Sequence, residues 1–133
     1  MSIVLSKIQE AKDKRLKTLH ISSNQLSELP KEIGNLTNLQ ELYIYNNQLS
    51  ELPKEIGKLV NLEHLSISNN QLSELPKEIG KLVNLERLDI WNNYLQIFIP
   101  NIKYGIFINQ KYKNEYISKM KKCDLVFNIR KNI

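Results

Sequence analysis

A ten-residue segment, QLSELPKEIG, occurs three times in this chain, at residues 25–34, 48–57 and 71–80. Each copy begins 23 residues after the previous one. Self-similarity at a fixed period is the signature of a solenoid, in which each unit buries its apolar face only against its neighbours. The repeat therefore predicts the architecture of the chain before any other feature is considered.

Each unit begins at a leucine and follows L-x-x-L-x-I-x-x-N-x-L-x-x-L-P-x-x-I-G-x-L. The units cover residues 16–38, 39–61, 62–84 and, in part, 85–100. In the second unit Leu42 and Ile44 are two residues apart, so both point to one side of an extended segment. This spacing predicts strands at residues 18–22, 41–45, 64–68 and 87–91. In register they form a parallel sheet with one buried and one open face, and the L-P-x-x-I-G-x-L segment supplies the crossover.

Two further slots of the repeat have structural roles. The asparagine slot is expected to face inward, because a side-chain amide both donates and accepts and can bond the backbone at the turn after each strand. Its members are Asn24, Asn47, Asn70 and Asn93. The prolines lie in the return segment, where a missing backbone donor is harmless. They are Pro30, Pro53 and Pro76. We expect these positions to build the fold and to carry no chemistry.

This pattern resembles the leucine-rich repeat family, and its L-P-x-x-I-G turn resembles the intracellular, Ras-group-like branch. The resemblance covers residues 16–100. It implies an α/β fold: a leucine-rich repeat solenoid, shaped as a short curved horseshoe, with the parallel sheet on its concave face. It also implies that this concave face, the open side of the sheet, binds another protein.

The copies of the repeat differ mainly on the concave face. The second and third units differ at four of 23 positions, and three of these four point outward from the strand. The return-segment residues Lys54 and Glu55 recur unchanged as Lys77 and Glu78. Neutral drift after duplication is the alternative explanation. The candidate partner-binding residues are Glu41, Tyr43, Tyr45, His64, Ser66, Ser68, Arg87, Asp89 and Trp91.

Aromatic residues and arginine dominate binding energy in protein interfaces, so the only tryptophan, Trp91, is the expected anchor.

His64, Ser66 and Asp89 share this face and invite a Ser-His-Asp interpretation. A triad also needs an oxyanion hole and a site that excludes water, which an open sheet does not provide. The alternation Glu41, His64, Arg87 is more simply explained as surface charges that pair with one another. Two histidines and one distant cysteine do not make a metal site, and there is no glycine-rich phosphate loop. We expect no enzyme activity, no cofactor and no small-molecule substrate.

The ends of an open solenoid are expected to be capped, because each exposes an apolar cross-section. Residues 1–15 are the expected N-terminal cap: a capping box at Ser6 would open a helix that ends near Arg15, with Leu5, Ile8 and Ala11 on the covering face. Residues 101–133 are the expected irregular C-terminal cap. A helix is predicted near residues 113–123, and the alternation of Leu125, Phe127 and Ile129 predicts a last strand.

The charge of the chain suggests an alternative function. The net charge is +5, but residues 16–100 carry seven basic and ten acidic groups, whereas residues 101–133 carry eight basic and two acidic. A basic arm beside Tyr112 and Tyr116 would suit nucleic acid or an anionic membrane, with the repeats as a scaffold. Its lysines are Lys111, Lys113, Lys119, Lys121 and Lys122. A third possibility is a repeat protein with no specific partner.

The compartment is expected from composition. The chain has no run of about 18 apolar residues and no recognisable signal peptide at its start. Its single cysteine, Cys123, cannot form an intrachain disulfide. A reducing, intracellular (cytoplasmic) setting and a monomeric protein are therefore the expectation.

Overall fold

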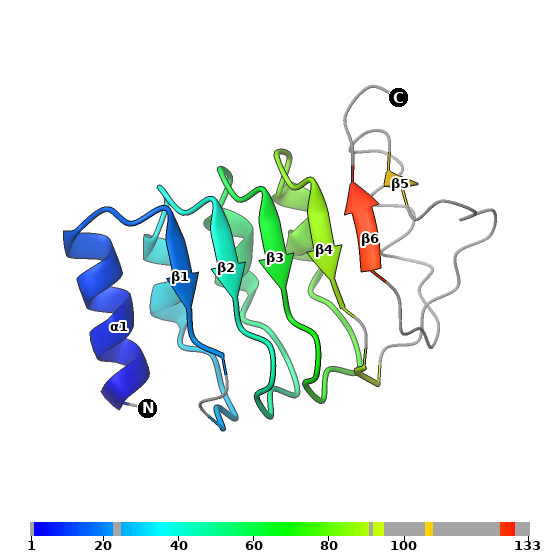
Figure 1. The fold of residues 1–133 in the computed structure, drawn as a ribbon, viewed down its shortest axis with the longest axis horizontal. Helices are drawn as coiled ribbons and strands as arrows, with labels where there is room; N and C mark the ends of the chain where they lie inside the picture. The colour runs from blue at the N-terminus through cyan, green and yellow to red at the C-terminus, as the bar shows by residue number, and fades with distance from the viewer. Residues whose placement is uncertain (1, 23–24, 91, 95–105, 108–125, 130–133) are drawn as a thin grey trace.

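The structure is a computed structural model that describes residues 2–22, 25–90, 92–94, 106–107 and 126–129. A helix comes first, and four strands then alternate with three short 3-10 helices (Figure 1). In chain order these are α1 (Ser2–Asp13), β1 (Thr18–His20), η1 (Lys31–Asn35), β2 (Glu41–Tyr43), η2 (Lys54–Lys58), β3 (His64–Ser66), η3 (Lys77–Lys81) and β4 (Arg87–Asp89). Two further strands follow, β5 (Ile106–Phe107) and β6 (Val126–Ile129).

The strands form one sheet in the order β1-β2-β3-β4-β6-β5. Strands β1 to β4 are parallel, and residues 23 apart in the sequence lie opposite one another, as Leu42 does with Leu65. The 3-10 helices lie behind the sheet, so that its other face is open (Figure 1). The solenoid predicted from the repeat is confirmed.

The strands are shorter than predicted, with three residues in place of five. The hydrogen-bond ladder nevertheless continues one residue further, because the Ile44 N–H donates to the Ser66 carbonyl at 2.8 Å. The chain then turns at Asn46 and Asn69, whose φ angles are 58° and 55°. This left-handed region is one that asparagine tolerates better than most residues, so each strand ends at the same place in its repeat.

Buried asparagines tie one repeat to the next. The Asn47 side-chain amide donates to the carbonyls of Ile21 and Ile44 at 2.9 and 3.1 Å, and its oxygen accepts from the Leu26 N–H at 3.0 Å. Asn70 makes the same contacts one repeat later. The inward asparagines are therefore confirmed for Asn47, Asn70 and Asn93, whereas Asn24 lies outside the described residues.

The core is a column of leucines and isoleucines between the sheet and the 3-10 helices, with Leu42, Ile44 and Ile56 fully buried. Each 3-10 helix follows a proline with extended backbone, as at Pro53 (φ −69°, ψ 148°). The close spacing between successive 3-10 helices depends on glycine. A Cβ at Gly57 would lie 2.9 Å from the carbonyl oxygen of Glu78, so a larger residue would push the repeats apart.

The N-terminal helix covers the first repeat with Ile8 and Ala11, as predicted, but with Val4 in place of Leu5. It begins at Ser2, so Ser6 lies within the helix and the predicted capping box is wrong. Val4, Ile8 and Ala11 are buried against the core, whereas Leu5 is 38% exposed. The reason is geometric: positions 4, 8 and 11 share one helical stripe, and Leu5 lies beside it.

At the other end, β6 pairs antiparallel with β4, placing Phe127 opposite Leu88, and β5 pairs with β6. The alternation at residues 125–129 predicted this last strand correctly. The helix predicted near residues 113–123 lies outside the described residues. Among the helices that the structure describes, none has the length and apolar character to cross a membrane.

Candidate functional site

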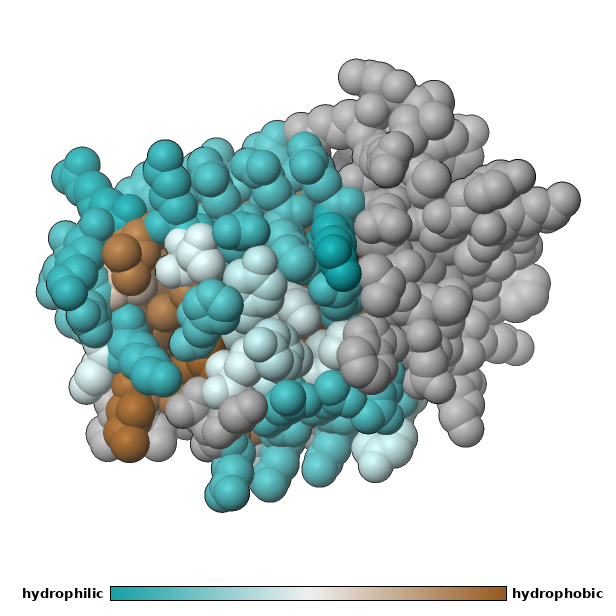
Figure 2. Space-filling view, in the orientation of Figure 1, coloured by the Kyte–Doolittle hydropathy of each residue, from teal (hydrophilic) through white to brown (hydrophobic). Residues whose placement is uncertain are grey.

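The concave face carries the outward side chains of β1 to β4 and of the residues that follow each strand. Glu41, Tyr43, Tyr45 and His64 are partly buried there, and Arg87 is exposed. The remaining candidates, Ser66, Ser68 and Asp89, are buried. Trp91 lies outside the described residues. Figure 2 shows pale colours over the middle strands, so this face is neither strongly apolar nor densely charged.

Six side chains of the concave face form one hydrogen-bonded network across four strands. The Thr18 hydroxyl donates to Glu41 Oε1 at 3.0 Å, and the Tyr43 hydroxyl donates to Glu41 Oε2 at 3.1 Å. The same hydroxyl lies 3.2 Å from His64 Nδ1. His64 Nε2 then lies 2.9 Å from Asp89 Oδ2, and Arg87 Nε donates to Asp89 Oδ1 at 2.9 Å. The contacts run across the sheet, from β1 to β4.

The centre of the network is the Tyr43–His64 pair. Burial and the hydrogen bond to Glu41 raise the pKa of the Tyr43 phenol, so the phenol keeps its proton at neutral pH. Three contacts meet here, from Tyr43 to Glu41, from Tyr43 to His64 and from His64 to Asp89.

Asp89 is the ionised end of the network. Burial acts to raise the pKa of its carboxyl, but the hydrogen bonds from His64 and Arg87 outweigh this effect, and the pKa is lowered. The Asp89 side chain is only 10% exposed, whereas that of Arg87 is 53% exposed. Asp89 therefore acts as a fixed, charged support beneath a partly exposed guanidinium.

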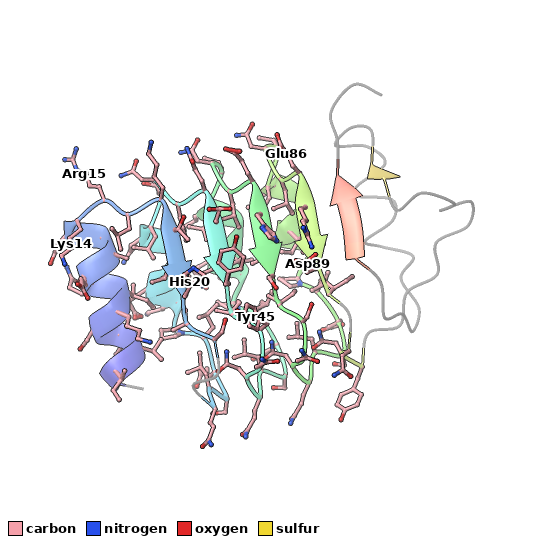
Figure 3. The ribbon with its side chains drawn as sticks, in the orientation of Figure 1. Lys14, Arg15, His20, Tyr45, Glu86 and Asp89 are labelled. Atoms are coloured by element: carbon pink, nitrogen blue, oxygen red, sulfur yellow. The ribbon has the colours of Figure 1, made fainter. Side chains whose placement is uncertain are left out.

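Aromatic rings cluster on the same face. His20 stacks on Tyr43 with ring centroids 4.5 Å apart and planes 10° from parallel. Tyr45 meets Tyr43 edge to face at 6.4 Å, and His64 does so at 5.0 Å. Figure 3 labels His20 on β1, Tyr45 just after β2 and Asp89 on β4, all on this one face. We call His20, Tyr43 and Tyr45 the ring cluster.

The geometry argues against the Ser-His-Asp interpretation. His64 does contact Asp89, but its other ring nitrogen faces Tyr43, and both nitrogens are thereby engaged away from Ser66. The direct pairing expected along Glu41, His64 and Arg87 is wrong. Glu41 and His64 both contact Tyr43, and His64 and Arg87 both contact Asp89, so the three residues are linked through Tyr43 and Asp89.

Two members of the site were missed by sequence reasoning. Thr18 and His20 belong to the first repeat, whereas the candidate residues came from comparing the second repeat with the third, so this comparison did not single them out. The strand register supplies the signal, because His20 lies directly opposite Tyr43. Aligning outward positions across all four repeats would have found both residues.

Other candidate sites are weaker. In the described part of the chain, no three His, Cys, Asp or Glu side chains are grouped as metal ligands. A pocket of about 300 Å³ lies between α1 and η1, lined by residues that include Ile8, Lys12 and Glu32, far from the network. The basic arm at residues 111–122 lies outside the described residues.

Comparisons with known proteins agree with the fold. Residues 11–93 match the leucine-rich repeat region family, and residues 84–104 match the single leucine-rich repeat. A leucine-rich repeat protein of Leptospira interrogans is similar in structure, with a TM-score of 0.62 and 48% identity over 66% of this chain and 23% of its own. An internalin from Listeria monocytogenes is similar at a TM-score of 0.51, with 26% identity over 61% of this chain and 22% of its own.

No curated protein matches the chain. The matched part of the chain spans less than a quarter of the length of either of these two solved structures. The family match, by contrast, covers more than half of the chain, including all four parallel strands and the three 3-10 helices. Domains of this kind typically act as non-enzymatic modules that bind other proteins. The chain belongs to the leucine-rich repeat family.

Proposed function

We propose that this protein is a non-catalytic module that binds another protein through its concave face. The observation that carries the proposal is the hydrogen-bonded network from Thr18 to Arg87, together with the ring cluster packed against it. Side chains held by such contacts lose little conformational freedom on binding, so a partner meets a preorganised surface.

The composition of the face supports a protein as the partner. Partly exposed tyrosines beside a fixed arginine are the groups that contribute most to protein interfaces. The face is an open sheet, which suits a protein surface or a peptide better than a small molecule that needs an enclosed pocket. An intracellular location and a monomeric state are part of the same proposal.

The test compares the partners captured by four forms of the full chain. These are the wild type, Tyr45→Ala, Tyr43→Phe and Lys54→Ala, each first checked for an unchanged melting temperature. We expect proteins that the wild type captures to be lost with Tyr45→Ala and retained with Lys54→Ala, because Lys54 lies on the return segment. Tyr43→Phe keeps the ring and removes the hydroxyl, so a partial loss would show that the network contributes. Equal capture by all four forms would contradict the proposal.

A further inference from the structure

Among the charged side chains of the concave face that the structure describes, Arg87 has donors that are not used within the face. Its Nε donates to Asp89 Oδ1, and the side chain is 53% exposed. Within the described part of the chain, no side chain accepts a hydrogen bond from the two terminal nitrogens, Nη1 and Nη2. The guanidinium is therefore held at one edge and open at the other.

The acidic groups of the network, in contrast, have a hydrogen-bond partner at every carboxylate oxygen. Glu41 accepts from Thr18 with one oxygen and from Tyr43 with the other. Asp89 has His64 at one oxygen and Arg87 at the other. Each of these carboxylate oxygens already has a partner within the face, whereas the terminal nitrogens of Arg87 have none among the described side chains. The guanidinium is therefore the charged group of this face that is best placed to bind a new partner.

The open edge of Arg87 fits a carboxylate. A guanidinium is planar and presents parallel N–H groups that match the two oxygens of a carboxylate. The bond to Asp89 fixes Nε and so reduces the freedom that the side chain would lose on binding. The surrounding repeats, residues 16–100, carry seven basic and ten acidic groups, so these repeats do not attract a long acidic segment. This favours recognition of a single acidic side chain.

The ring cluster lies on the same face as this guanidinium, at a spacing set by the strands. Arg87 is on β4 and Tyr43 is on β2, with β3 between them. Two strand spacings amount to roughly 10 Å. An extended peptide advances about 3.3 Å per residue, so about three residues cover that distance.

We infer that the concave face takes an extended segment of a partner protein with an Asp or Glu side chain on Arg87. An apolar or aromatic side chain of the same segment, about three residues away, contacts the ring cluster. This inference rests on the proposed function and adds to it the chemistry of the partner.

The test selects linear 12-residue peptides from a random display library on the immobilised full chain. Selected peptides are synthesised in pairs, with each Asp or Glu kept or replaced by Asn or Gln. Their affinities are measured for the wild type, Arg87→Gln, Arg87→Lys, Tyr45→Ala and the control Lys54→Gln. The peptide-side replacement needs no change in the protein, so it is informative even if an Arg87 variant folds poorly.

Some selected peptides should bind the wild type but not Tyr45→Ala. We expect each of these peptides to lose about tenfold in affinity when one of its acidic residues is replaced by the corresponding amide. Arg87→Gln should cause a similar loss, with little further loss when both changes are combined, because both remove the same contact. Arg87→Lys should retain only part of the affinity that Arg87→Gln loses. Binders that require Tyr45 but ignore both changes would overturn this inference and leave the proposed function standing. A selection with no Tyr45-dependent binder would overturn both.

Discussion

At the scale of single residues, the repeat decides most of what each side chain does. The asparagine slot was predictable because three copies in identical surroundings must make identical contacts, and Asn47, Asn70 and Asn93 do so. The diagonal contacts of His64 were not predictable. The register gives the position of each Cα, but the rotamer that carries a ring to Tyr43 and Asp89 depends on all its neighbours together.

Replacing Asn70 by Ala should lower the free energy of unfolding by about 1–3 kcal/mol, because buried backbone groups would lose their partners. The measurement is equilibrium unfolding in urea. The matched control is Asn61→Ala, since Asn61 is exposed and its side-chain amide donates to the backbone carbonyl of Thr37 at 2.8 Å. The control should change stability by no more than about 0.5 kcal/mol. Equal effects would mean that the inward position of Asn70 is unimportant.

Asp89→Asn tests the ionised end of the network. Because the pKa of Asp89 is lowered from 3.8 in the folded chain, its stabilising contribution is present above about pH 3.8 and is lost as pH falls through the lowered pKa. We expect the variant to be less stable than the wild type by about 1–3 kcal/mol at pH 7. This difference should shrink towards zero at lower pH.

Urea unfolding between pH 2.5 and 7 measures this difference, with the exposed Glu86→Gln as a control for the loss of one charge. A difference between wild type and Asp89→Asn that stays constant over the whole range would show that ionisation of Asp89 does not stabilise the fold.

At the scale of elements, the period predicted where strands occur but not where they end. The apolar alternation continues to residue 45, whereas β2 ends at Tyr43 because the chain turns at Asn46. The start of α1 was also missed. Ser6 matches a capping box locally, but burial of Val4, Ile8 and Ala11 against the first repeat favours a helix that begins one turn earlier. Tertiary packing outweighs the local signal there.

The packing of one 3-10 helix on the next can be tested at Gly57. Gly57→Ala would place a Cβ 2.9 Å from the backbone oxygen of Glu78, an atom that cannot move aside without shifting η3. We expect a loss of about 1–3 kcal/mol in thermal or urea unfolding. Lys54→Ala, exposed on the same 3-10 helix, should be nearly neutral. If Gly57→Ala were as stable as the wild type, the repeats would not need this close approach.

At the scale of the whole molecule, the two ends of the repeat array are covered by different kinds of element. α1 packs beside the first repeat, and β6 extends the sheet beyond β4 (Figure 1). The sequence predicted atypical ends on general grounds, and it located β6 through its alternation. It did not predict that β6 runs antiparallel, because strand direction depends on the path of the chain between residues 95 and 125.

Deletion of residues 101–133 should leave the edge of β4 unpaired, and such edges promote association. We expect a lower melting temperature and higher-order species in size-exclusion chromatography with light scattering. Phe127→Pro is a milder variant that interrupts the pairing opposite Leu88 and keeps the chain. A truncated chain that stays monomeric with the melting temperature of the wild type would mean that β6 does not protect β4.

The proposed function depends on recognition of the partner at the concave face. The most direct measurement is nitrogen-15 NMR of the labelled full chain, titrated with the tightest peptide from the selection described above. We expect the largest amide shifts at His20, Tyr43, His64 and Arg87, on the four parallel strands. Shifts confined to α1 or to the 3-10 helices around Lys54 and Lys77 would place binding on another surface and contradict the proposed function.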